Sequence, residues 1–126
     1  MQNRNKPFRS SNDKRLILVA DDEMINREIL GEILKTEYDI LFAADGEETL
    51  EKIRQNKDTL SLVLLDVLMP VMTGMEVLKA MKEDESLSRI PVVVTTSERS
   101  MEVESLRLGA IDFIPKPYPA VDVIHA

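Results

Sequence analysis

The chain has 126 residues and a formal net charge of −7, with 44% hydrophobic and 31% charged residues. That length suits one domain whose core is large enough to fold without disulfides, and the composition is typical of a globular protein. The charge disfavours direct binding of nucleic acid. The absence of cysteine excludes disulfides and thiolate metal sites and fits a reducing cytoplasm, and no apolar run is long enough to cross a membrane.

Residues 1–14 are polar and show no hydrophobic period. They also lack the apolar segment that a signal peptide needs. We therefore expect a flexible N-terminal arm over residues 1–14 and one folded domain over residues 15–126.

Five short apolar runs follow the arm, and segments with helical periodicity separate them. Continuous apolar runs of four or five residues are typical of strands buried on both faces of a parallel sheet. The predicted strands cover residues 16–20, 40–43, 62–65, 91–95 and 111–114. This alternation predicts a doubly wound α/β domain with helices on both faces of the sheet.

The first predicted helix follows the strand at residues 16–20, and Asp21 or Asp22 is a candidate for its N-terminal cap. Its periodicity predicts one buried face, made of Ile25, Ile29, Leu30, Ile33 and Leu34.

The second helix is predicted to begin at Asp45, with Glu48 completing a capping box. The third begins near Thr73, and the fourth ends at Gly109, a residue type that often follows a helix. The buried positions expected for the second and third helices are Leu50, Ile53, Val77, Leu78 and Met81.

A fifth helix is predicted to begin near Pro119, and the sequence ends at Ala126. Two turns present little apolar area, since helices average about 11–12 residues. We expect this helix to be truncated and the parent protein to continue beyond Ala126.

Polar side chains gather at the predicted carboxyl ends of the strands, where open α/β sheets bind their ligands. The first strand is followed by two acids, the third ends in one, the fourth closes with two threonines, and a lysine follows the fifth. These residues are Asp21, Asp22, Asp66, Thr95, Thr96 and Lys116.

Three carboxylates at one edge repel one another by about 1–4 kcal/mol per pair at intermediate dielectric, so a cation must neutralise them unless they are protonated. Hard oxygen ligands select Mg²⁺. A carboxylate is also a nucleophile toward a phosphoryl group. The pattern predicts Mg²⁺-dependent phosphoryl transfer to Asp66, with Lys116 and a threonine hydroxyl near the phosphoryl oxygens.

Four segments of this sequence resemble the receiver domains of bacterial two-component response regulators: ILVADDE, LVLLDVLMPVMTGMEVL, IPVVVTTSE and LGAIDFIPKPY. The resemblance extends over residues 14–126, and Asp-x-x-Met-Pro-x-Met-x-Gly is its most specific part. It implies a flavodoxin-like strand order 2-1-3-4-5. It also implies a switch rather than a turnover enzyme, phosphorylated by a sensor histidine kinase or a phosphotransfer protein.

The same resemblance assigns roles to single residues. Asp66 is the phosphoacceptor, and Lys116 pairs with the phosphoryl group. Asp22, Asp66 and the backbone carbonyl of Leu68 are the direct Mg²⁺ ligands, while Asp21 acts through water.

The switch hydroxyl is assigned to Thr96, with Thr95 as the alternative, and Phe113 occupies the aromatic switch position. The resemblance further implies a cis peptide bond between Lys116 and Pro117. It also implies a homodimer through the fourth helix, fifth strand and fifth helix.

Two other functions remain as alternatives. A degenerate receiver that only binds proteins would lack an acid, the lysine or the hydroxyl, and none is missing. A phosphatase of the haloacid-dehalogenase type would need an aspartate two residues after the nucleophile, where Leu68 stands.

Overall fold

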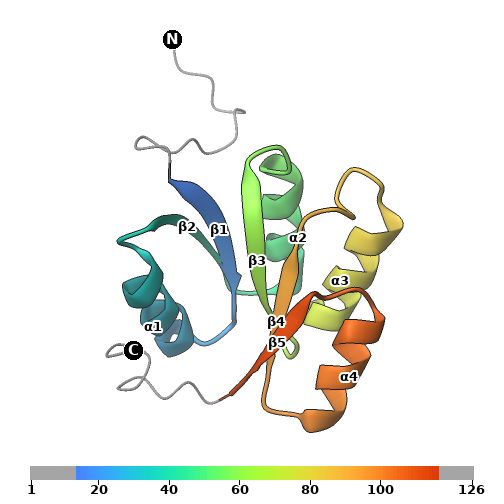
Figure 1. The fold of residues 1–126 in the computed structure, drawn as a ribbon. Helices are drawn as coiled ribbons and strands as arrows, with labels where there is room; N and C mark the ends of the chain where they lie inside the picture. The colour runs from blue at the N-terminus through green and yellow to red at the C-terminus, as the bar shows by residue number, and fades with distance from the viewer. Residues whose placement is uncertain (1–13, 117–126) are drawn as a thin grey trace.

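Strands and helices alternate along residues 14–116, the part of the chain that the computed structural model describes (Figure 1). The strands are β1 (Arg15–Ala20), β2 (Tyr38–Ala43), β3 (Leu60–Asp66), β4 (Val92–Thr96) and β5 (Asp112–Pro115). The helices are α1 (Met24–Leu34), α2 (Gly46–Gln55), α3 (Gly74–Glu83) and α4 (Arg99–Arg107). All five strands were predicted within two residues of these bounds. The expected fifth helix and the expected cis bond before Pro117 lie outside the described residues.

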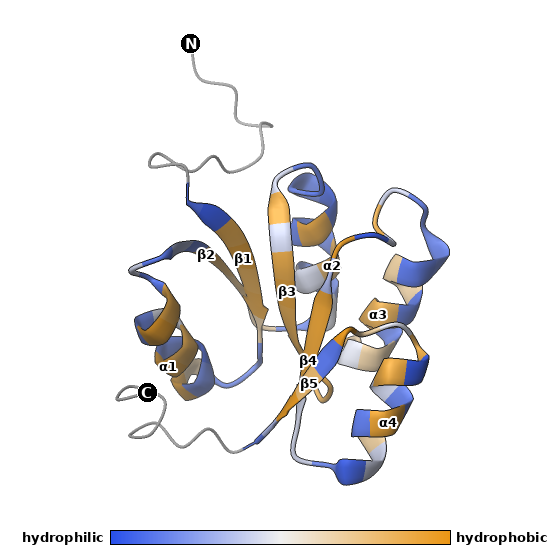
Figure 2. Ribbon diagram, in the orientation of Figure 1, coloured by the Kyte–Doolittle hydropathy of each residue, from blue (hydrophilic) through white to orange (hydrophobic). Residues whose placement is uncertain are grey.

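The five strands form one parallel sheet in the order β2-β1-β3-β4-β5, as expected. Figure 1 shows α1 on one face of this sheet and α2, α3 and α4 on the other. The apolar strand interiors, orange in Figure 2, meet these helices from both sides. The predicted doubly wound architecture is confirmed. No helix among residues 14–116 has the length and apolarity needed to span a bilayer.

Burial differs between the central and the outer strands. β1 is buried from Leu16 onward, and β3 is buried or partly buried along its whole length. The outer strands β2 and β5 are mostly half-buried or exposed. The expectation that all five strands are buried on both faces was therefore wrong for these two, because an edge strand has only one neighbour in the sheet.

The helices confirm most of the predicted buried positions. Leu50 and Ile53 of α2 are buried, as are the three predicted residues of α3. Asp45 caps α2 through Glu48 N–H, but the Glu48 carboxylate accepts from Ala44 N–H instead of closing the capping box. Gly109 follows α4 with a φ of 115°.

Helix α1 departs from prediction at its N-terminus. Ile25 is 65% exposed, because five helical residues place it about 140° around the helix axis from the buried Leu30. The N-cap is Glu23, which makes no side-chain cap bond, so neither Asp21 nor Asp22 caps this helix.

The start of α3 presses against the end of β3. A Cβ atom on Gly74 would lie 2.0 Å from the carbonyl oxygen of Asp66, and Gly74 N–H donates to the Val67 carbonyl at 2.8 Å. A capping box between Thr73 and Glu76 holds the first turn in place. Glycine at position 74 thus permits the close approach of α3 to the backbone of Asp66.

We expect Gly74→Ala to lower the free energy of unfolding by about 3 kcal/mol, because backbone atoms would have to move to admit the methyl group. Gly31→Ala is the control. Its Cβ would lie 3.0 Å from the tip of the Phe42 ring, a side chain on an edge strand, so a change within about 1 kcal/mol is expected. Urea unfolding of both variants measures the difference, and equal stabilities would contradict the steric argument.

Candidate functional site: an acidic cluster bridged by a lysine

The carboxyl ends of β1, β3 and β5 bring three carboxylates and one ammonium group together. Asp21 and Asp22 follow β1, Asp66 ends β3, and Lys116 follows β5. One carboxylate oxygen from each of the three aspartates lies within 4.8 Å of the others. Asp21 and Asp66 are buried, whereas Asp22 is exposed. Three hard oxygen donors at this spacing fit a divalent cation.

Lys116 bridges the two buried acids. Its Nζ lies 3.1 Å from Asp21 Oδ2 and 3.0 Å from Asp66 Oδ1. Its backbone N–H donates to the Thr96 carbonyl at 2.9 Å, which extends the β4–β5 ladder to the lysine. The β4–β5 ladder therefore holds the backbone of Lys116 where its side chain contacts the two acids.

Burial and charge move two pKa values at this site. Burial raises the pKa of Asp66 to about 6, and the charge of Asp21 adds to the rise while Lys116 opposes it. Burial alone would lower the pKa of Lys116, but its hydrogen bond and charge interactions with Asp66 and Asp21 raise that pKa above its ordinary value. The lysine therefore stays charged at neutral pH.

Backbone and side-chain donors hold the acids in place. Asp21 Oδ1 accepts from Glu23 N–H at 2.9 Å, and the Asp21 carbonyl accepts from Arg27 Nη1 at 2.7 Å. Asp66 Oδ1 also accepts from Leu68 N–H at 3.3 Å. Among the described residues Asp21 Oδ2 has the ion pair with Lys116 but no hydrogen-bond donor. Arg27 was not predicted, since an arginine on a helix surface gives no signal in the sequence.

A groove of about 560 Å³ opens over the cluster. It is lined by Asp22, Glu23, Asn26, Asp66, Leu68, Thr96, Ser97 and Lys116. Five of these were predicted site residues, and Glu23, Asn26 and Ser97 were not. The only signal in the sequence for these three residues is that they lie close to the acids or to Thr96 along the chain.

The two candidate threonines differ in position. Thr95 is buried in the sheet opposite Asp66 and does not line the groove. Thr96 lines the groove, and its Oγ1 accepts from Glu98 N–H at 2.9 Å. Phe113 lies half-buried in β5, outside the groove.

The loop between β3 and α3 contains one strained residue. Val71 has a φ of 70° and is 75% exposed. A β-branched side chain in the left-handed region is disfavoured by its contact with the backbone. The same loop carries Leu68, whose backbone N–H contacts Asp66.

Comparison with known proteins places the chain in one family. The family described as the response regulator receiver domain matches residues 17–126. The chain belongs to this family. It is therefore a receiver domain of two-component signal transduction, and the family role is phosphorylation by a histidine kinase.

Individual relatives agree with this membership. Histidine kinase P4 of Formosa agariphila is 39% identical over 84% of this chain and 8% of its own length. The transcriptional regulatory protein CpxR of Escherichia coli is 36% identical over 81% of this chain and 43% of its own length. The receiver thus spans less than half of either relative.

Solved structures share the fold. A chain in the CheX-CheY-BeF₃-Mg²⁺ complex from Borrelia burgdorferi is 28% identical, with a TM-score of 0.76. The match covers 88% of this receiver and 84% of that chain.

In metal-free buffer, we expect Asp66→Asn to be more stable than the parent by about 3 kcal/mol at pH 7.5. The unfolded aspartate ionises near pH 3.8, whereas the folded one keeps its proton to about pH 6. The parent therefore loses stability as pH rises through this window, and the gap between the two proteins should vanish below pH 3.8.

Asp84→Asn is the matched control, because hydrogen bonds from Ser86 lower the pKa of the exposed Asp84. Its effect should have the opposite sign, with the variant less stable than the parent at neutral pH. Chemical denaturation between pH 3.5 and 7.5 measures both. A gap for Asp66→Asn that is independent of pH would contradict the assignment.

Proposed function

We propose that Asp66 accepts a phosphoryl group with Mg²⁺ as the cofactor, and that the acyl phosphate switches the signalling face of this receiver. The observation that carries the proposal is the Lys116 ammonium 3.0 Å from Asp66 Oδ1, within a cluster of three carboxylates. One buried acid thus faces both a cation and a groove open to a donor.

In the proposed transfer, an Asp66 oxygen attacks phosphorus and forms a P–O bond. The bond from phosphorus to the imidazole nitrogen of phosphohistidine, or to the oxygen of a small acyl phosphate, breaks, and the leaving group keeps the electron pair. Bound Mg²⁺ would neutralise charge on the phosphoryl oxygens. Lys116 then exchanges the Asp66 carboxylate for a phosphoryl oxygen. These roles make the domain a phosphoacceptor switch and not a turnover enzyme.

The proposed Mg²⁺ ligands are Asp22, Asp66 and the backbone carbonyl of Leu68, with Asp21 acting through water. The contacts of Asp21 support its indirect role, because one of its oxygens accepts from Glu23 N–H and the other pairs with Lys116. Asp22 lies exposed at the groove. It is thus free to turn toward a cation.

Thr96 is the proposed switch hydroxyl, because it lines the groove and Thr95 does not. Its present bond to Glu98 N–H, next to the first residue of α4, would be exchanged for one to the phosphoryl group. That exchange would couple Asp66 to α4 and, through β5, to Phe113.

The proposed partners are a sensor histidine kinase or phosphotransfer protein, and an effector domain that follows the receiver in the cytoplasmic parent protein.

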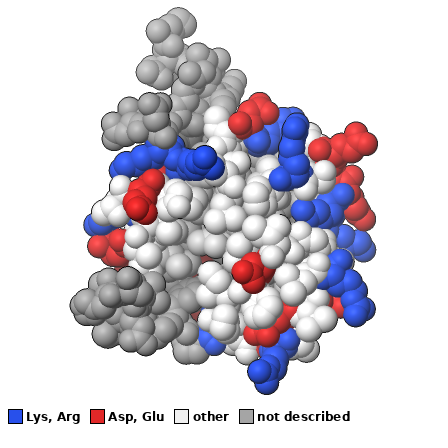
Figure 3. Space-filling model, viewed as in Figure 1, with Lys and Arg blue, Asp and Glu red and all other residues white. Residues whose placement is uncertain are grey.

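The face formed by α4 and β5 is the proposed site of phosphorylation-dependent dimerisation, together with residues after 116. Val103, Leu106, Ile111 and Ile114 are exposed there. Figure 3 shows a largely uncharged centre on the face where Figure 1 places β5. The proposed domain bounds remain 15–126, after an arm of residues 1–14.

Incubation with acetyl phosphate and Mg²⁺ is expected to add one phosphoryl group to the chain, measured by intact-mass spectrometry. Asp66→Asn and an EDTA-treated sample are the controls, and both should stay unlabelled. Equal labelling of Asp66→Asn would overturn the assignment of the acceptor.

Asp22→Asn is expected to raise the Mg²⁺ concentration that gives half-maximal labelling by about tenfold. This shift should exceed that of Asp21→Asn because, of these two aspartates, only Asp22 is a proposed direct ligand. Labelling yield across a Mg²⁺ titration measures both variants. Equal shifts would contradict the division of roles.

Thr96→Ala is expected to accept the phosphoryl group but to lose most of the phosphorylation-dependent change in self-association. The hydroxyl distinguishes the two states, and only such differential contacts shift a population. Thr95→Ala is the neighbouring control, with sedimentation before and after labelling as the measurement. A full response in Thr96→Ala and an impaired one in Thr95→Ala would move the switch to Thr95.

A further inference from the structure

The loop between β3 and α3 is fixed at both ends by backbone hydrogen bonds. Val67 N–H donates to the Thr95 carbonyl at 3.0 Å, and Gly74 N–H donates to the Val67 carbonyl at 2.8 Å. Val67 and Met69 are buried, whereas Leu68 is 56% exposed and lines the groove over the acids. The loop is therefore tied to the sheet and to α3, with Leu68 at the groove.

The middle of the loop is a tight turn. Met72 N–H donates to the Pro70 carbonyl at 2.7 Å, across the single residue Val71. With the φ of 70° at Val71, this bond closes a γ-turn of the rare and strained kind. The ring of Pro70 also fixes its own φ, so residues 70–72 have little freedom to change shape and move as one unit.

The first residue of α2, Gly46, is packed against this turn. Gly46 is buried, and its N–H donates to the Pro70 carbonyl at 3.5 Å. A Cβ atom at position 46 would lie 1.9 Å from the Met72 carbonyl oxygen and 2.6 Å from its carbonyl carbon. These are backbone atoms and cannot turn aside as the end of a side chain can, so a methyl group at this position must displace either α2 or the turn.

Helix α2 is the more firmly held of the two. The Asp45 carboxylate accepts from Glu48 N–H at 2.7 Å at the start of the helix, and Leu50 and Ile53 are buried in the core. The turn, in contrast, contains Val71, which is strained and 75% exposed. The displacement would therefore fall mainly on the turn.

A displaced turn has to carry Leu68 with it. At the α3 end the loop cannot absorb the shift, because Gly74 already lies against the backbone of Asp66. At the β3 end, Leu68 N–H donates to Asp66 Oδ1 at 3.3 Å, a long hydrogen bond that a small shift breaks. The position of the Leu68 backbone beside Asp66 thus depends on the space left at position 46.

We propose that Gly46 is a positioning residue for the metal site, because its lack of a side chain lets α2 hold the turn where the Leu68 backbone lies beside Asp66. The inference rests on the proposed role of the Leu68 carbonyl as a Mg²⁺ ligand. Gly46 does not line the groove itself. It acts through the turn, so the proposed metal site extends to a helix that supplies none of its proposed ligands.

Gly46→Ala tests this role in the full 126-residue chain. Isothermal titration calorimetry without a phosphodonor measures the dissociation constant for Mg²⁺. The constant is expected to rise by about tenfold over the parent, because residues that orient metal ligands contribute on that scale. An unchanged constant would overturn the proposal.

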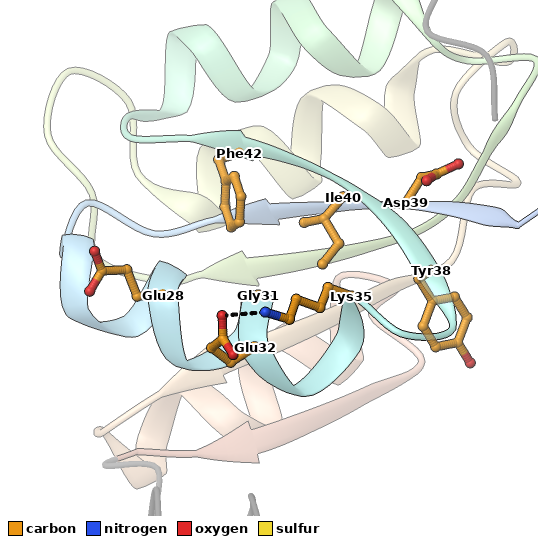
Figure 4. A pocket seen from close by; sticks show the side chains of 8 residues that line it. All are labelled: Glu28, Gly31, Glu32, Lys35, Tyr38, Asp39, Ile40 and Phe42. Atoms are coloured by element: carbon orange, nitrogen blue, oxygen red, sulfur yellow. Dashed lines mark hydrogen bonds and ion pairs between the residues drawn. The ribbon is translucent and has the colours of Figure 1, made fainter. Parts of the chain in front are cut away.

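Gly31→Ala is the control for the substitution itself. Figure 4 shows Gly31 on α1, in the wall of a groove of about 590 Å³ between α1 and β2. A Cβ atom there would meet the Phe42 ring, 3.0 Å from its tip, and not the loop. This variant should bind Mg²⁺ as the parent does.

Asp45→Ala is the control for α2. It removes the cap bond to Glu48 N–H and leaves the contact between Gly46 and Met72 as it is. It should melt several degrees lower and still bind Mg²⁺ as the parent does. A loss of Mg²⁺ affinity as large as that of Gly46→Ala in either control would overturn the proposal, since general destabilisation would then explain it.

A double variant keeps the test decisive where Gly46→Ala alone does not fold. In Gly46→Ala/Val71→Gly, loss of the branched side chain lets the turn open and yield to the new methyl group. The Mg²⁺ dissociation constant should still be about tenfold above that of Val71→Gly alone, because the yielding loop carries Leu68 out of place. Equal constants for these two variants would refute a positioning role.

Asp22→Asn separates this inference from the proposed function. If Asp22→Asn loses Mg²⁺ affinity and Gly46→Ala does not, only the role of Gly46 fails. If both bind as tightly as the parent, the proposed metal ligands fail as well.

Discussion

Two buried carboxylates, Asp21 and Asp66, share one ammonium group, that of Lys116. Like charges at this distance repel strongly when water is excluded, so the lysine is what permits both acids to stay buried and close. The Lys116 side chain reaches both acids because β5 lies beside β4 and because the Thr96 carbonyl accepts from the Lys116 backbone N–H. The strand order therefore lets one lysine, which follows β5, neutralise acids at the ends of two other strands, β1 and β3.

Stability and chemistry occupy different parts of the same strands. Leu18, Val63 and Leu65 are fully buried in the strand interiors and contribute to the core. The residues one step beyond those interiors carry the charges. Burial raises the pKa of Asp66, which is a cost that the apolar interior must offset.

The sequence contained enough to predict the sheet, its helices and the clustered acids, because short apolar runs and strand ends are local signals. Leu50, Ile53 and the Asp45 cap followed from spacing alone. The exposure of Ile25 was missed, although five helical residues place it about 140° around α1 from the buried Leu30. The bond from Arg27 to the Asp21 carbonyl was also missed, because it depends on where α1 lies over the end of β1. The half-burial of β2 and β5 depends on strand order, which apolar runs do not encode.

Val71, with its positive φ, stores conformational energy in the loop that leads from Asp66 to α3. A residue held in this region costs about 1–3 kcal/mol, and the surrounding contacts must hold it there. A second conformation of the loop in which Val71 leaves the positive-φ region would be favoured by that same energy. A ligand on Asp66 would then supply only the remainder of the difference between the two arrangements. The loop beside the acids therefore holds conformational energy because a β-branched side chain stands at position 71. A glycine there would hold none.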